Sequence, residues 1–283
     1  NFTALELSRR VGVAYTPRVR FVDVSFNGQP LGNYLLAEQV KIAPERINID
    51  PRTGFLLELD QRRDNPIVIV TNCNVLYNIK EPVAIKPERV EQIADYMKTV
   101  EDVLNSDNFA DPMEGYAKYI DVDSFINIYL VEEIFKNQDA ASFSSIYFYK
   151  AETGKLVLGP AWDFDIGAGN VDYSDAKSPA GWWIQRDSPW FNRLFQDPQF
   201  RKRVKARWNQ LKDTRIDTMM DFIDRSAATI EGSQRNNFEI WNTLNKAVWP
   251  NPVVMGSYAR EVRYFKFWLQ NRIEWMDLQI RQY

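Results

Sequence analysis

The sequence predicts an α+β fold with two lobes, a small antiparallel β lobe over residues 1–86 and a larger helical lobe over residues 87–283. Two observations support this division. Apolar and polar residues alternate along several short segments of the first lobe, which is typical of half-buried strands. From Pro87 onward the apolar residues recur at helical spacing instead. A chain of 283 residues that is 45% hydrophobic and 14% aromatic can bury a sizeable core.

Four segments of the first lobe are predicted to be strands. Residues 18–26 alternate in polarity, and Asn27-Gly28 is a strong hairpin signal that leads into a return strand over residues 34–42. A short helix precedes them, because Thr3 and Glu6 have the spacing of a capping box. Two further strands are expected over residues 54–59 and 67–70. We therefore expect one antiparallel sheet of about four strands.

The second lobe is predicted to be helical apart from one hairpin. Residues 87–104 begin with a proline, which suits a helix N-terminus. Asp121 or Asp123 caps a second helix that continues to about Lys136. A hairpin is expected over residues 145–158, followed by an acidic loop. The remaining helices are expected over residues 190–195, 198–211, 216–230 and 258–280.

Absent and scarce residue types limit the possible chemistry. The chain has no histidine, which excludes Ser-His-Asp catalysis, histidine zinc sites and histidine acid–base catalysis. The single Cys73 excludes an intramolecular disulfide. A net charge of −3 gives no basic field for nucleic acid. No apolar run reaches the roughly 18–20 residues of a membrane helix. Carboxylates and lysines must therefore carry any proton chemistry.

The loop over residues 159–170 contains the clearest chemical pattern. Asp163 and Asp165 follow a predicted strand, and Gly167, Gly169 and Asn170 come directly after them. Carboxylate and amide oxygens are hard donors that suit Mg²⁺ or Ca²⁺. The glycines let the backbone turn tightly or approach a phosphate. The loop therefore predicts a magnesium and nucleotide site, although such an acidic pair also caps turns and binds structural Ca²⁺.

Asp139 lies upstream of the hairpin, at the polar end of the second predicted helix. A carboxylate, a hairpin and a carboxylate in an Asp-Phe turn is the order found in the catalytic segment of protein kinases. Because an antiparallel hairpin returns the chain to its starting point, Asp139 and Asp163 should lie close together in a shared cleft. Such carboxylates repel each other in the absence of a cation, so we expect both pKa values to be raised.

Three ordered motifs resemble the CotH kinase family, the spore coat protein H-like atypical kinases. They are residues 32–40 (Gly-Asn-Tyr-Leu-Leu-Ala-Glu-Gln-Val), Asn137-Gln138-Asp139 with the aromatic strand Tyr147-Phe148-Tyr149-Lys150, and residues 159–165 (Gly-Pro-Ala-Trp-Asp-Phe-Asp). The similarity is clear over residues 1–170 and looser over the helical remainder. It implies a two-lobed atypical protein-kinase-like fold.

The resemblance also implies roles for individual residues. Asp139 corresponds to a catalytic or metal-binding aspartate, and Asp163 corresponds to a catalytic, metal-binding aspartate. Asp165 is the further candidate metal ligand of the acidic loop. Family members usually carry an asparagine just before the aromatic strand, where this chain has Ser145, and we therefore take Ser145 as a third candidate ligand.

Nucleotide binding is assigned to Glu38, Lys41 and Asn170. The family's N-terminal strands include a lysine expected to pair with nucleotide phosphates, and they are expected to lie before residue 1. The β lobe would then be N-terminally incomplete. Lys41 is the candidate lysine within the lobe present here.

Three functions remain open from the sequence. The first is ATP- and Mg²⁺-dependent phosphoryl transfer to a protein hydroxyl, with Mn²⁺ or Ca²⁺ as alternative ions. The second is a non-catalytic module of the same fold that binds metal, a glycan or a protein partner. A glycosidase ranks last, because Asp163 and Asp165 on one turn are too close to flank a sugar. We expect an extracytoplasmic protein, secreted or on a bacterial cell surface.

Overall fold

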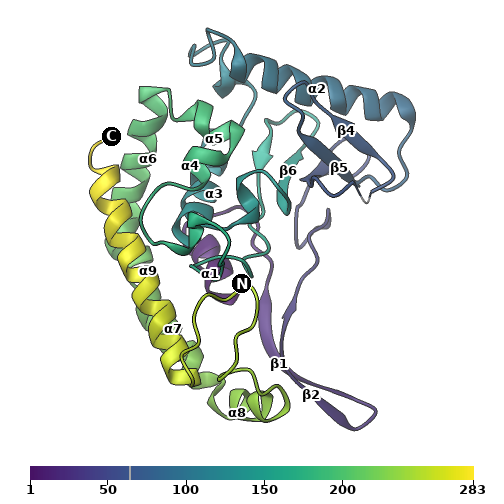
Figure 1. Cartoon of the computed structure of the whole chain (residues 1–283). Coiled ribbons are helices and arrows are strands. Elements are labelled where there is room, and N and C mark those ends of the chain that lie inside the picture. Colours follow the sequence, from purple (N-terminus) through teal and green to yellow (C-terminus); the bar gives the residue numbers. More distant parts are fainter. Residues whose placement is uncertain (64) are drawn as a thin grey trace.

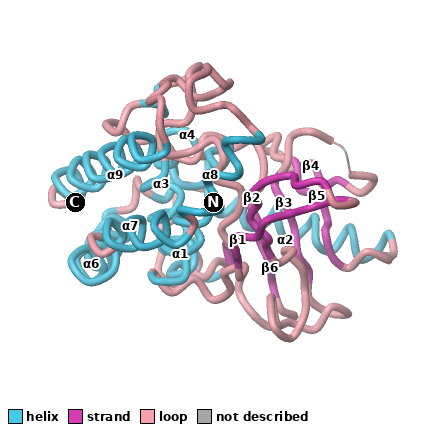
Figure 2. The backbone as a smooth tube through the Cα atoms, turned by 90° about the horizontal axis from the view of Figure 1, so that it is seen from below, coloured by secondary structure: helices cyan, strands magenta, loops and turns pink. Residues whose placement is uncertain are grey.

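The computed structural model describes residues 1–63 and 65–283. Most helices gather in one half of the molecule, and the strands lie in the other half together with α2 (Figure 2). The fold is α+β and two-lobed, which confirms the predicted class. Among the helices of the described residues, none combines the length and apolarity needed to cross a membrane.

The strands form two separate sheets. Strands β1 (Val19–Phe26) and β2 (Gln29–Ala37) make a two-stranded antiparallel ribbon. The larger sheet has the order β4-β5-β3-β6-β7 and is antiparallel throughout. Its strands are β3 (Phe55–Leu59), β4 (Val68–Val70), β5 (Leu76–Glu81), β6 (Ile146–Lys150) and β7 (Val157–Leu158).

This topology corrects the prediction of a single sheet in the first lobe. The hairpin β6–β7 pairs with β3, so a segment from beyond residue 140 completes the larger sheet. The return strand of the ribbon ends at Ala37, and Glu38 and Lys41 therefore follow the strand instead of lying on it. The strand β5 has no counterpart in the sequence prediction.

The helices agree more closely with the sequence prediction than the strands do. They are α1 (Phe2–Arg10), α2 (Pro87–Asn105), α3 (Val122–Phe135), α4 (Ile184–Asp187), α5 (Pro189–Leu194), α6 (Pro198–Leu211), α7 (Met219–Thr229), α8 (Glu231–Ile240) and α9 (Tyr258–Ile280). Short 3₁₀ turns occur at η1 (Tyr116–Lys118), η2 (Asp139–Ala141) and η3 (Asp175–Lys177), and a π-helical turn at η4 (Lys212–Ile216).

Side-chain capping explains where α3 begins. The carboxylate of Asp121 accepts a hydrogen bond from the Ser124 N–H at 3.0 Å, which satisfies a free donor of the first turn. The predicted capping box at α1 is wrong, because Thr3 lies inside the helix. Glu6 instead accepts from Arg9 and Arg10, both at 2.7 Å.

The main core surrounds α3, whose residues are buried on nearly every side. A helix that is apolar all round belongs in the interior of a protein. A smaller apolar cluster packs on the other face of the larger sheet; its buried members are Tyr15, Ile42, Ile47, Leu56 and Tyr147. The two faces of β3 and β6 are therefore both covered, and each faces a different environment.

The C-terminal helices reach back to the N-terminal ribbon (Figure 1). Asn237 of α8 accepts a hydrogen bond from the Asn33 N–H at 2.9 Å, and the Trp241 indole donates to the Leu31 carbonyl at 2.7 Å. Helix α8 is absent from the sequence prediction, since its residues lack a regular apolar stripe. These contacts fasten β2 to the end of the helical lobe.

Candidate functional site

The acidic turn follows β7 and is anchored by Phe164. This ring is buried and packs edge-on against Phe135, with the ring centroids 5.6 Å apart. Asp163 itself adopts a left-handed backbone conformation, with φ of 62°. Such a conformation is uncommon outside glycine, although aspartate tolerates it better than most residues. The anchored phenylalanine leaves the carboxyl groups of Asp163 and Asp165 free to take part in polar contacts.

The carboxyl groups of Asp163 and Asp165 act on each other electrostatically. Burial, followed by the charge of Asp165, raises the pKa of Asp163. Two neighbouring carboxylates repel each other when both are ionised. Ser145 donates a hydrogen bond to Asp163 Oδ2 at 3.1 Å. The turn therefore contains excess negative charge that a proton or a cation can neutralise.

Asp139 joins this pair from the other side of the hairpin. Burial, and then the charges of Asp165 and Asp163, raise the pKa of Asp139. The structure thus brings the two predicted aspartates into one electrostatic environment, and both pKa values move in the expected direction. We call Asp139, Asp163 and Asp165 the acidic cluster.

A buried glutamate and asparagine lie behind the acidic cluster. Asn137 donates to the Asp163 carbonyl and to Glu132 Oε2, both at 2.9 Å. Burial raises the pKa of Glu132 to about 8, and the negative charge of Asp163 adds to the effect. Asn137 therefore fixes the backbone of the acidic turn against the end of α3.

Two ion pairs near the acidic cluster were not predicted from the sequence. Lys80 pairs with Glu58 at 2.9 Å, and Tyr147 donates to the same glutamate at 2.9 Å. The charge of Asp163 is among the causes that raise the pKa of Tyr147, after burial and Glu58. Tyr147 therefore links the Lys80–Glu58 pair to the acidic cluster.

The second ion pair follows β3. Arg62 pairs with the buried Asp60 at 2.9 Å, and its positive charge lowers the pKa of both Asp139 and Asp163 against the stronger effect of burial. The only sequence signal for these residues was the acidic pattern at the end of a predicted strand. Lys80 of β5 and Tyr147 of β6 reach Glu58 only through long-range strand pairing, whereas Asp60 and Arg62 are two residues apart.

The predicted nucleotide-binding residues lie in three different settings. Glu38 accepts from Arg18 Nε at 2.9 Å and from the Arg18 N–H at 2.9 Å, and these bonds lower its pKa. Lys41 is exposed in the segment after β2. Asn170 donates to the Asp165 carbonyl at 2.7 Å and so closes the acidic turn. Only Asn170 among the three has a direct contact with that turn.

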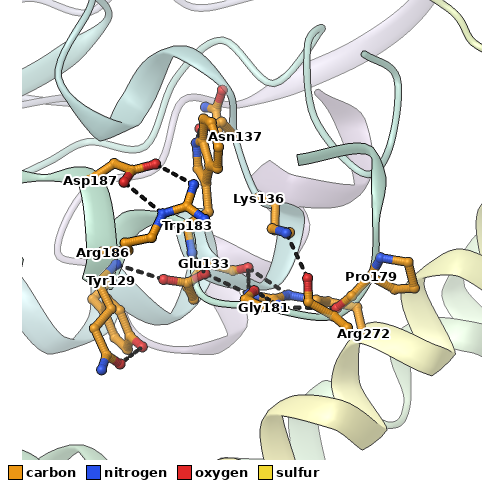
Figure 3. Close-up of polar contacts among 12 residues, drawn as sticks. Tyr129, Glu133, Lys136, Asn137, Pro179, Gly181, Trp183, Arg186, Asp187 and Arg272 are labelled. Atoms are coloured by element: carbon orange, nitrogen blue, oxygen red, sulfur yellow. Dashed lines mark hydrogen bonds and ion pairs between the residues drawn. The ribbon is translucent and has the colours of Figure 1, made fainter. Parts of the chain in front are cut away.

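The backbone after the acidic turn is held by buried charges (Figure 3). Lys136 donates to the carbonyls of Ser178 and Ala180 at 3.0 and 2.9 Å. Arg272 donates to the Pro179 and Gly181 carbonyls at 2.9 and 2.7 Å. These bonds fix the segment over residues 175–181 beside the end of α3.

A close approach at Gly169 completes the loop. Its φ is +82°, and a Cβ atom there would lie 2.5 Å from the Trp268 indole nitrogen. Only glycine fits at this position. The loop predicted from its glycines therefore turns tightly against α9.

The donor set of the acidic cluster suits a hard cation. Magnesium sites in proteins commonly use one or two carboxylates and complete the shell with water and substrate phosphates. Asp163 and Asp165 supply such a pair, and the Asn137 amide oxygen is buried without a hydrogen-bond donor among the described residues. Within residues 1–63 and 65–283, no three acidic side chains are already spaced as a metal-binding set.

Comparison with known proteins defines the family. The family model described as CotH kinase protein matches residues 1–276, almost the whole chain. The chain therefore belongs to the CotH kinase family, a family of kinase-like proteins, as its sequence motifs indicate. A search of curated proteins found no match.

Proposed function

We propose that this chain is an atypical kinase domain that transfers the γ-phosphoryl group of ATP to a hydroxyl group of a protein. The observation that carries the proposal is the acidic cluster, in which Asp139 and the Asp163–Asp165 pair share one electrostatic environment across the β6–β7 hairpin. Phosphoryl transfer needs this combination of a metal-holding carboxylate and a carboxylate beside the acceptor. It needs no histidine.

Each residue of the acidic cluster has a distinct task. Asp163 and Asp165 would hold Mg²⁺, with Mn²⁺ or Ca²⁺ as alternatives, and Ser145 orients Asp163. The bound ion would neutralise charge that develops on the phosphoryl oxygens. Asp139 orients the acceptor hydroxyl and takes its proton as the oxygen attacks the γ-phosphorus and the bond to ADP breaks. A raised pKa makes Asp139 a stronger base for that step.

The nucleotide side of the site is assigned to basic and amide groups. Lys41 and Asn170 remain candidates for phosphate contacts, and Glu38 for the nucleoside. Lys80 is a further candidate, because its partner Glu58 sits on the adjacent strand beside Tyr147. A lysine held by a glutamate is the arrangement that protein kinases use against nucleotide phosphates.

Nucleotide binding with and without Mg²⁺ tests this function. We expect the wild-type chain to bind ATP in a Mg²⁺-dependent manner, and Asp163→Ala to abolish that binding while the variant stays folded at the assay temperature. Asp139→Asn should keep binding but lower phosphoryl transfer to a protein acceptor by at least 100-fold. Asp123→Asn, an exposed aspartate on α3, is the matched control. Equal ATP binding by wild type and Asp163→Ala would remove the proposal.

A non-catalytic module of the same fold is the second candidate. Ser145 in place of the family asparagine, and the absence of a ready-made acidic metal set among the described residues, favour it. Such a module would bind metal, a glycan or a protein partner outside the cytoplasm, on a bacterial surface or after secretion. Thermal unfolding measures binding of each ligand. A rise in melting temperature with metal ions but not with ATP would support this function over the first.

A further inference from the structure

A pocket lies at the end of β6 away from the acidic cluster. Its volume is about 310 Å³, and its walls come from the first turns of α2, the start of β3 and the end of β6. Lys150 shares the face of Phe148 in the main core, because side chains alternate along a strand. Ser145, which donates to Asp163, comes five positions before Lys150, or about 16 Å along an extended chain. We call this hollow the basic pocket.

Three cationic side chains line the basic pocket, namely Arg52, Arg89 and Lys150, against one carboxylate residue, Glu152. Arg52 pairs with Asp50 at 2.7 Å. Neither Arg89 nor Lys150 forms an ion pair with a carboxylate in the described part of the chain. Burial and then the charge of Arg89 lower the pKa of Lys150, and the charge of Glu152 acts in the opposite direction. Two like charges are therefore held near each other, with Glu152 as the one carboxylate residue of the pocket lining.

Neutral acceptors fix both cations in place. Arg89 donates to Gln92 at 3.2 Å and to the Thr53 carbonyl, which uses two of its five N–H donors. Its Nε atom is buried with no partner among the described residues. Lys150 donates to the carbonyls of Ala151 and Glu152 at 2.9 and 2.8 Å. These contacts orient the side chains without placing either cation in an ion pair.

The lower part of the pocket is apolar. Phe55 and Ile93 are buried there, and the Lys150 ammonium lies 5.0 Å from the centre of the Tyr96 ring. The volume is at the lower end of the roughly 300–1,000 Å³ of small-ligand pockets, and exceeds what a bare ion needs. The pocket therefore suits an anionic group carried on a short side chain.

We propose that the basic pocket binds the phosphoryl group of a phosphorylated serine or threonine on a partner protein. A phosphoryl group carries nearly two negative charges and three acceptor oxygens, which matches two cations that form no ion pair and the N–H donors that they have left. A carboxylate offers one charge and two oxygens, and would leave one cation unmatched. This site goes beyond the proposed phosphoryl transfer and does not depend on it, because the prediction concerns binding alone.

Calorimetric titration of the folded chain with a short phosphoserine peptide tests the proposal. We expect saturable binding that weakens as salt is added, with no binding of the unphosphorylated peptide. Arg89→Gln should weaken binding at least 10-fold, and Lys150→Gln about 5- to 10-fold. Arg52→Gln, at the exposed rim, should have an effect of about 2-fold. Lys155→Gln, on the same hairpin but outside the pocket, is the matched control and should bind like wild type.

Two further ligands test whether the pocket recognises a phosphorylated peptide or any anion. Inorganic phosphate and a peptide with aspartate in place of phosphoserine should each bind at least 10-fold more weakly than the phosphopeptide. Equal binding of inorganic phosphate would show a free-anion site, and equal loss in Lys155→Gln would show general charge attraction; either result overturns the proposal. Because Arg89 also contacts Thr53, Arg89→Lys provides a second variant that keeps the charge. It should retain the fold yet lose several-fold in affinity.

Discussion

Glu132 and Glu133 are consecutive residues of α3, and both are buried, but their surroundings are opposite. Glu133 accepts from Arg272 at 2.5 Å and from the N–H groups of Trp183 and Gln185, both at 2.8 Å. Glu132 accepts a hydrogen bond from the neutral Asn137 at 2.9 Å. The negative charge of Asp163 disfavours the ionised form of Glu132. One glutamate faces a compensated ion pair and the other faces the acidic cluster.

This difference separates structural charge from charge available for function. A buried carboxylate that is fully paired holds its surroundings in one arrangement, here the segment over residues 175–181 (Figure 3). A buried carboxylate without a cation favours its protonated form, and nearby carboxylates share that cost. The first kind of site resists change, whereas the second gains stability when a proton or a metal ion arrives.

Breaking the ion pair between Glu133 and Arg272 should have the largest effect on stability. Arg272→Met leaves Glu133 buried without its cation and removes donors from the Pro179 and Gly181 carbonyls. We expect the free energy of unfolding to fall by about 3–5 kcal/mol, as measured by urea denaturation. Arg281→Met breaks an exposed pair with Asp277 and should cost less than about 1 kcal/mol. Similar losses in the two variants would contradict the structural role of the Glu133 pair.

Replacing Glu132, which has no cationic partner among the described residues, should alter how stability depends on pH. The pKa of Glu132 is raised from 4.5 to about 8, so its contribution to stability is complete below pH 4.5 and is lost as the pH rises towards 8. The slope that this group adds is at most about −1.4 kcal/mol per pH unit. Glu132→Gln should remove that slope, as measured by urea denaturation from pH 5 to 8. Glu114→Gln, an exposed control, should keep the wild-type slope.

The smallest expected effect concerns the acidic cluster itself. Asp165→Asn removes a like charge beside Asp163 and Asp139, so the pKa of each should move down towards its ordinary value. Because the raised values cost stability as the pH rises through them, the variant should be more stable than wild type at pH 7 in EDTA by about 0.5 kcal/mol or less. Thermal unfolding with and without Mg²⁺ measures this difference.

The control for that measurement is Asp172→Asn, an exposed aspartate of the following loop. Magnesium should raise the melting temperature of wild type and of this control but not of Asp165→Asn. A variant that responds to Mg²⁺ like wild type would show that Asp165 is not a ligand, and Asp163 would then have to bind the ion without it.

The local rules of the sequence predicted much of the helical lobe. Helical patterning placed α6 and α9 at residues 198–211 and 258–280, as observed. Period and capping depend on residues a few positions apart, which is why a short window of sequence contains them. The acidic turn was visible for the same reason, because Asp163, Phe164 and Asp165 are consecutive.

Residues that act through distant partners were invisible to these rules. Nothing near Lys80 in the sequence indicates Glu58 or Tyr147, because β3, β5 and β6 meet only when the larger sheet forms. The same holds for Arg89 and Lys150 of the basic pocket, which come from α2 and β6. Strand pairing of this kind depends on which surfaces can be buried together, a property of the whole chain.

By itself, the sequence determined the kinds of charge this protein has available and the local backbone that presents them: carboxylates without histidine, an Asp-Phe-Asp turn, and helices with clear ends. Only the tertiary structure decided which of those charges are compensated. Glu132 and Glu133 are equivalent in the sequence, and they differ because α9 brings Arg272 to one and the acidic turn brings Asp163 to the other. The cost of a buried charge depends on its neighbours in space, and those neighbours are fixed only by folding.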